Sequence, residues 1–153
     1  MSSQEPGSTS GPRVEFYVIE DSAPAARLKL ACRIAEKAFL VDQSVLVWHT
    51  DLDELKTFDE LLWTFSDRSF VPHAVWPAEP SVAEHTPVLI ASGALPESHR
   101  DVLINLAPDA PAEPGRFDRI CEVVGADEDT KRRARLRWRG YADAGLAPTK
   151  HDL

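Results

Sequence analysis

Basic residues are concentrated near the end of the chain, around Trp138. Six of the 17 Lys and Arg residues lie within the nine positions 131–139, which contain no acidic residue. On a helix of about 100° per residue, one face would carry Lys131, Arg135, Trp138, Arg139 and Ala142. Arginine pairs with a carboxylate through two parallel N–H bonds, and an indole beside it can hold an apolar side chain. The spacing predicts a binding site for an anionic ligand with an apolar group; a solvated basic face with Trp138 packed inward also fits the pattern.

The remainder of the chain is strongly acidic. The net charge is −8 overall, and the residues outside 131–139 comprise 11 basic and 25 acidic side chains, a net charge of −14. A body of that sign repels a nucleic-acid backbone, so the short cationic element favours a localised anionic partner. A direct nucleic-acid-binding protein that uses this basic helix remains the alternative function, because arginines also contact phosphates.

Other residues with chemical potential have simpler interpretations. His49, Asp51, Asp53 and Glu54 could be metal ligands or an acid–base group, but carboxylates also favour a helix start, which is our interpretation. The chain contains no G-x-G-x-x-G, P-loop or G-x-S-x-G motif. Cys32 and Cys121 lack C-x-x-C spacing, which predicts two buried thiols. We therefore expect no catalytic residue, no cofactor and no metal site.

Large aromatic side chains cluster between positions 61 and 71. Burying Trp63, Phe65 and Phe70 together in the core of a small domain would be crowded. We expect at least one of them at the surface, where aromatic anchors stabilise protein interfaces. The alternative, with all three in the core, is left open by the sequence.

Alternating strand and helix patterns predict a single α/β domain. Strands are expected at 14–19, 44–48, 87–90, 102–106 and, as the last strand, 120–124. Helices are expected after a Ser22 cap through Phe39, from Asp51 through Leu62, and over about 128–144. This order implies a three-layer, Rossmann-like open sheet, largely parallel, with helices on both faces and no nucleotide site.

The two ends of the chain set the expected boundaries. Residues 1–12 are rich in Ser, Gly and Pro and are expected to form a flexible tail before a single domain over 13–153. The tail lacks the basic start and apolar stretch of a secretion signal, and no apolar run approaches the roughly 20 residues that span a bilayer. We therefore expect a cytoplasmic protein without membrane contact.

Two neighbouring motifs are together specific for one protein family: Asp59-Glu60-Leu61-Leu62-Trp63 and Ser69-Phe70-Val71-Pro72-His73. Other segments match the same family but are less specific: Phe16-Tyr17, Leu52-Asp53-Glu54, Arg100 to Leu106, Phe117 to Val124 and the helix from Lys131 to Gly145. Over residues 14–146 the chain resembles the chi subunit of DNA polymerase III. The resemblance implies a Rossmann-like fold without nucleotide, no enzymatic activity and a role as an adaptor in the clamp-loader complex.

The resemblance also implies two partners. One is the psi subunit, whose contacts carry over to Trp63 and Phe70; in some relatives a helicase-like protein uses the same surface. The other is the acidic C-terminal tail of single-stranded DNA-binding protein, which ends in Phe with a free carboxylate. The positions that bind this tail in the family correspond to Val124, Lys131, Arg135, Trp138 and Arg139 of this chain. Trp138 stands where the best-known relatives have tyrosine, and Ala142 stands where some have arginine, which would remove one contact.

Overall fold

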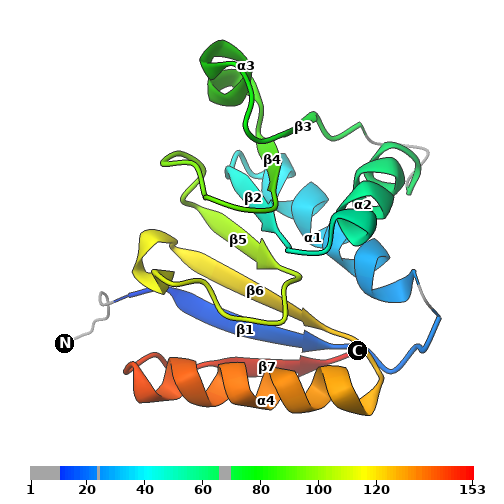
Figure 1. Ribbon diagram of the computed structural model, residues 1–153, viewed down its shortest axis with the longest axis vertical. Coiled ribbons are helices and arrows are strands. Elements are labelled where there is room, and N and C mark those ends of the chain that lie inside the picture. Colours follow the sequence, from blue (N-terminus) through cyan, green and yellow to red (C-terminus); the bar gives the residue numbers. More distant parts are fainter. Residues whose placement is uncertain (1–10, 24, 66–69) are drawn as a thin grey trace.

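Seven parallel strands form one open sheet in the computed structural model, which describes residues 11–23, 25–65 and 70–153 (Figure 1). The strand order is β3-β4-β2-β5-β6-β1-β7, and each neighbouring pair is parallel. Apart from Gly11 and Pro12, the expected tail 1–12 lies outside the described residues. The strands are β1 (Arg13–Val18), β2 (Val45–Trp48), β3 (His73–Val75), β4 (Val88–Ala91), β5 (Val102–Asn105), β6 (Arg119–Val124) and β7 (Thr149–Asp152).

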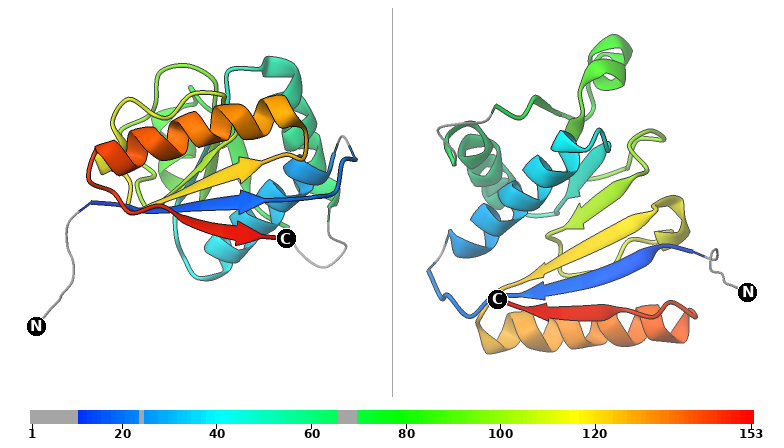
Figure 2. Two further views of the ribbon diagram at one scale, coloured as in Figure 1. Left: turned by 90° about the horizontal axis from the view of Figure 1, so that it is seen from below. Right: turned by 180° about the vertical axis from the view of Figure 1, so that it is seen from behind.

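Helices cover both faces of this sheet (Figure 2). On one face α1 (Ala26–Leu40) and α2 (Leu52–Thr64) pack on alternate strand residues such as Val45 and Val47. The other face, which includes Leu46, is covered by the short α3 (Pro80–His85) and by α4 (Glu128–Asp143). Two cores on opposite sides of a parallel sheet confirm the predicted three-layer, Rossmann-like architecture. Among the described helices, none is long and apolar enough to cross a membrane.

Local signals mark the ends of two helices as the sequence predicted. The Asp51 side chain accepts hydrogen bonds from the backbone N–H groups of Asp53 and Glu54 and so caps α2. Asp127 caps α4 in the same way through Thr130. Gly145 follows α4 with φ of +87°, a left-handed conformation that glycine adopts without steric cost, and it ends the helix.

Two expectations were wrong. Ser22 does not cap α1: the N-cap position is Ala25, which has no side-chain cap, and Asp21 instead accepts a bond from the Ala23 backbone N–H. The sequence also suggests Pro24 in the first turn of that helix, but Pro24 lies outside the described residues. β6 is also not the last strand, because the chain continues past α4 into β7, which pairs with β1 at the edge of the sheet.

Candidate functional site

The face of α4 that carries Trp138 borders a cleft of about 950 Å³. All of the sequence-predicted residues of the basic site line it: Val124, Lys131, Arg135, Trp138 and Arg139. Val124 comes from the carboxyl end of β6, and the other four come from successive turns of α4. Figure 2 shows α4 running alongside β1 and β7, whose residues form the opposite wall of the cleft. The structure therefore brings these five side chains together around one hollow.

An aromatic pair forms the apolar part of the cleft. The ring centroid of Trp138 lies 5.1 Å from that of Phe16, with the rings tilted by 52°. Phe16 is 2% exposed and also contacts Tyr141, whereas Trp138 is half-buried and lines the cleft. Trp138 is thus packed on the core without being sealed into it. An apolar group of a ligand can therefore contact the indole while the other side of the ring stays fixed.

The basic residues of α4 fall into three structural groups. Arg132 and Arg133 both pair with Asp129 on an exposed face. Arg137, which was counted in the basic segment 131–139 but not among the predicted site residues, is buried and pairs with Glu122. Lys131, Arg135 and Arg139 line the cleft, and none of these three has an ion pair with any residue that the structure describes. Of the basic residues of α4, this last group is the one that lines the cleft.

A buried polar cluster holds α4 against the sheet. The Glu122 carboxylate, which is fully buried on β6, accepts hydrogen bonds from Arg137 Nε at 2.9 Å, from the Tyr141 hydroxyl at 2.7 Å and from Asn105 Nδ2 at 2.9 Å. Arg137 also donates to the carbonyl of Pro108. Burial raises the pKa of Glu122, while Arg137 and the two other donors oppose that rise. Because Arg137 and Tyr141 flank Trp138 along the helix, this cluster fixes the orientation of the cleft wall.

Burial also raises the pKa of the Tyr141 hydroxyl, and the adjacent Glu122 carboxylate adds to the effect. Tyr141 therefore stays protonated and remains a hydrogen-bond donor. A charged residue within the apolar run 120–124 was a signal that a buried partner must exist, because an isolated buried carboxylate is costly. The sequence interpretation missed that signal.

The cleft contains further charges that the sequence interpretation missed. Lys150 and Asp152 line it from β7, a strand that was not predicted. Glu20, after β1, and Glu128, in the first turn of α4, also line it. Only the pairing of β7 with β1 brings Lys150 and Asp152 to this position, so no local sequence pattern could have indicated them.

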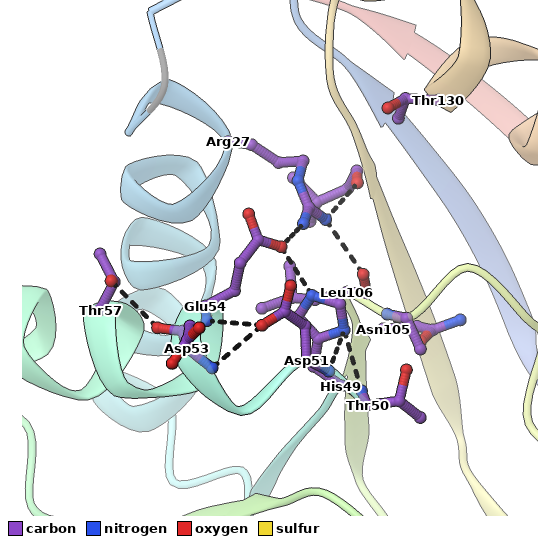
Figure 3. A network of polar contacts seen from close by, with 12 residues as sticks. Arg27, His49, Thr50, Asp51, Asp53, Glu54, Thr57, Asn105, Leu106 and Thr130 are labelled. Atoms are coloured by element: carbon purple, nitrogen blue, oxygen red, sulfur yellow. Dashed lines mark hydrogen bonds and ion pairs between the residues drawn. The ribbon is translucent and has the colours of Figure 1, made fainter.

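The polar residues after β2, His49, Asp51 and Glu54, form hydrogen bonds with their neighbours in the fold. His49 Nδ1 accepts the Thr50 backbone N–H, so Nε2 carries the proton and donates to Glu54 Oε1 at 2.6 Å (Figure 3). The same oxygen accepts from Arg27 Nη2 at 2.6 Å, and Arg27 also donates to two backbone carbonyls. His49, Asp51 and Glu54 lie close enough to share a metal ion. Each is already engaged, however, and a guanidinium beside Glu54 disfavours a cation.

The aromatic segment forms a separate surface near the end of α2. Trp63 is 53% exposed and Phe70 is 58% exposed, with ring centroids 5.2 Å apart. Trp63 also lies 4.5 Å from the ring of the mostly buried His73, whose Nε2 is 2.8 Å from Asp59 Oδ1. Phe65 is partly buried and packs against the core that contains α1 and α2. The expectation that at least one of the three aromatics reaches the surface is therefore confirmed.

A second hollow, of about 760 Å³, lies at the amino ends of β2, β4 and β5. Its walls include Trp76 and Leu95, and its rim includes Glu84 and Glu97. It contains none of the residues predicted from sequence and lies away from the cationic face of α4.

Comparison with known proteins shows the family of the chain. A family model described as DNA polymerase III chi subunit, HolC, matches residues 12–149. The DNA polymerase III subunit chi of Pseudomonas aeruginosa is 37% identical over 92% of this chain and 96% of that protein. The subunits of the same name from Escherichia coli (29% identical over 86% of this chain and 91% of that protein) and Haemophilus influenzae (27% over 82% and 86%) also match. The chain therefore belongs to the family of DNA polymerase III chi subunits.

Proposed function

We propose that this chain is a non-catalytic adaptor of the clamp-loader complex that binds the acidic C-terminal tail of single-stranded DNA-binding protein in the cleft beside α4. The observation that carries the proposal is the half-buried Trp138, packed on Phe16, beside three cations without ion-pair partners among the described residues. A tail that ends in Phe presents an aromatic ring, a free α-carboxylate and upstream acids. The cleft offers a complementary group for each.

The contacts follow from the placement of the side chains. Trp138 and Val124 flank the position for the terminal Phe ring, since both line the apolar part of the cleft. Arg135, one helical turn before Arg139, binds the α-carboxylate through its planar guanidinium. Lys131 and Arg139, on either side of Arg135 along the helix, attract the upstream acids.

The test is Arg135→Ala with a short acidic peptide ending in Phe, measured by isothermal titration calorimetry. A hydrogen bond to a charged group contributes about 1.5–3 kcal/mol, so the dissociation constant should rise roughly tenfold to a hundredfold. Arg133→Ala is the matched control, because Arg133 lies on the same helix but pairs with Asp129 outside the cleft. Unchanged affinity in Arg135→Ala, or equal losses in both variants, would reject the role given to Arg135.

A peptide with an amidated C-terminus separates the carboxylate contact from general charge attraction. The amide removes the group that Arg135 binds, so wild-type protein should bind it about as weakly as Arg135→Ala binds the free acid. If amidation has no effect, the terminal carboxylate is not recognised and the proposed orientation of the tail is wrong.

The Trp63–Phe70 surface is proposed to bind the psi subunit or, in its place, a helicase-like protein. The support is two adjacent aromatic rings, both more than half exposed, one of which also contacts the ring of His73. Exposed aromatics of this kind form the energetic centre of many interfaces, where truncation costs about 2 kcal/mol or more. Trp63→Ala should abolish capture of purified psi subunit, whereas Leu136→Ala, which removes an exposed apolar residue from α4, should not.

The alternative, direct binding of nucleic acid by α4, is less well supported. Phosphate contacts need several cations along one face, but Arg137 is buried, Arg132 and Arg133 lie outside the cleft, and three acids line the cleft beside its cations. A titration with single-stranded oligonucleotide and acidic peptide under the same salt conditions separates the two functions. Binding of the oligonucleotide in preference to the peptide would favour the alternative.

A further inference from the structure

The edge strand β7 supplies charges to the cleft from the side opposite α4. Lys150 lies beside Phe16 in the parallel register with β1, and Asp152 lies beside Val18. Both Phe16 and Val18 line the cleft, as do Lys150 and Asp152 themselves. The backbone N–H of Leu153 donates to the Val18 carbonyl at 2.9 Å and continues the pairing beyond the strand. The position of β7 at the cleft is therefore set by backbone hydrogen bonds to β1.

Alternation along the strand separates its four side chains. Lys150 and Asp152 face the cleft, whereas His151 lies on the other face of the sheet, where its ring stacks on Tyr17 at 4.9 Å. Residues two apart on one strand face are neighbours, and Lys150 Nζ lies 3.4 Å from Asp152 Oδ1. Lys150 thus has a carboxylate partner inside the site that is proposed to receive a carboxylate-rich ligand.

This internal pair is weak enough to be exchanged. The side chains of Lys150 and Asp152 are 56% and 69% exposed, and an exposed pair of this kind stabilises by only about 0.2–1 kcal/mol. A carboxylate of a ligand whose other acids are held by the cations of α4 can therefore replace Asp152 at Lys150.

The acids of the cleft lie toward one end of it. Glu20 follows β1, Glu128 is in the first turn of α4, and Asp152 is the last residue of β7. The cleft is lined by these three acids and by four cations, Lys131, Arg135, Arg139 and Lys150. The lining therefore carries a net charge of only +1. The affinity of this cleft for an acidic ligand therefore depends on how far its own acids neutralise its cations.

We propose that Lys150 is a fourth ligand-binding cation of the cleft and that Asp152 competes with the ligand for it and so lowers the affinity for acidic peptides. The inference rests on the proposed function, because it concerns the same site. It adds a specificity-determining pair outside α4. Lys150 increases the affinity for a ligand only if that ligand carries an acidic group that displaces Asp152.

The experiment is a double-mutant cycle on the full chain with the short acidic peptide ending in Phe, measured by calorimetry at low salt. Lys150→Gln should weaken binding by about two- to fivefold, and Asp152→Asn should strengthen it by a similar factor. In the Lys150→Gln background, Asp152→Asn should have little effect, because the competition requires the lysine. Both side chains are exposed, so thermal unfolding should confirm that neither change perturbs the fold.

Two controls separate local from overall charge. Arg133→Gln and Asp118→Asn make the same changes in net charge at exposed positions outside the cleft, and both should leave the affinity unchanged. If Asp152→Asn strengthens binding equally with and without Lys150, Asp152 acts only by general repulsion and the competition is refuted. If Lys150→Gln binds as wild type while Arg135→Ala is impaired, the inference fails and the proposed function stands. If wild-type protein binds no acidic peptide, both fail.

Discussion

The buried pair of Arg137 and Glu122 allows a quantitative test of how α4 is held on the sheet. Replacing Arg137 with Met keeps a long side chain but removes the ion pair at 2.9 Å and the bond to the Pro108 carbonyl. Glu122 is then left as a fully buried carboxylate whose remaining donors, among the residues that the structure describes, are Tyr141 and Asn105. Breaking a buried pair in this way costs about 3–5 kcal/mol, because one charge stays buried without its partner.

The free energy of unfolding should be measured by urea denaturation followed by tryptophan fluorescence. Arg133→Met is the matched control: Arg133 is on the same helix and has an acidic partner, but it is exposed, so its loss should cost less than about 1 kcal/mol. The double variant Arg137→Met with Glu122→Gln removes both charges and should be more stable than Arg137→Met alone. A loss below about 1 kcal/mol in Arg137→Met, with an unchanged urea dependence, would refute this account of the anchor.

Three further predictions concern pH, thiol reactivity and salt. Burial alone would raise the pKa of Glu15, but Arg119, with Arg13 and Tyr17, lowers it below the ordinary value of 4.5; the charged form is thus favoured by folding. Glu15→Gln should therefore be less stable than wild type above about pH 4.5, and urea titrations should show the gap closing as pH falls further. Burial raises the pKa of the Cys32 and Cys121 thiols to about 12, so a thiol reagent should label neither in native protein and both in urea. Acidic-peptide affinity should fall as salt rises, and a salt-independent affinity would contradict an electrostatic role for the cleft cations.

The architecture was predictable from sequence because its central strands are buried on both faces. Residues 45–48, 88–91 and 102–104 are short apolar runs, which is typical of the interior of a parallel sheet, and all three form strands. The helices were found from apolar spacing and, for α2, from the carboxylate at its start, Asp51. The Ser22 cap was wrong because a serine before a helical pattern is a common signal that the chain need not use.

The edge strand β7 could not be predicted in the same way. All four of its residues are exposed, so it carries no apolar run and no alternation of apolar with polar residues. It exists because its backbone pairs with β1, a segment more than a hundred positions earlier in the chain. A strand specified by long-range pairing alone is invisible to local patterns, and so Lys150 and Asp152 could not be assigned to the cleft beforehand.

The basic residues of α4 show why the number of charges in a segment is a poor guide to a site. A helical projection places Lys131, Arg135 and Arg139 on one side, and the cleft is found there. The same projection turns Arg137 toward the side of Tyr141, where it meets the buried Glu122. Knowing the partner requires the fold, because Glu122 reaches α4 only through its place on β6.

One helix therefore performs two roles, and a change in its anchor should affect both. Arg137 holds α4 on the sheet through its ion pair with Glu122, and the next residue, Trp138, forms part of the cleft wall. A change that loosens the anchor displaces the indole relative to Phe16, so it should weaken peptide binding even though Arg137 does not line the cleft. Arg135→Ala should weaken binding without lowering stability, because Arg135 lies at the surface without an ion pair to a described residue. Measuring the peptide affinity and the free energy of unfolding for both variants distinguishes a positioning residue from a ligand-binding one. The proposed roles require that Arg137→Met lowers both quantities and that Arg135→Ala lowers only the affinity.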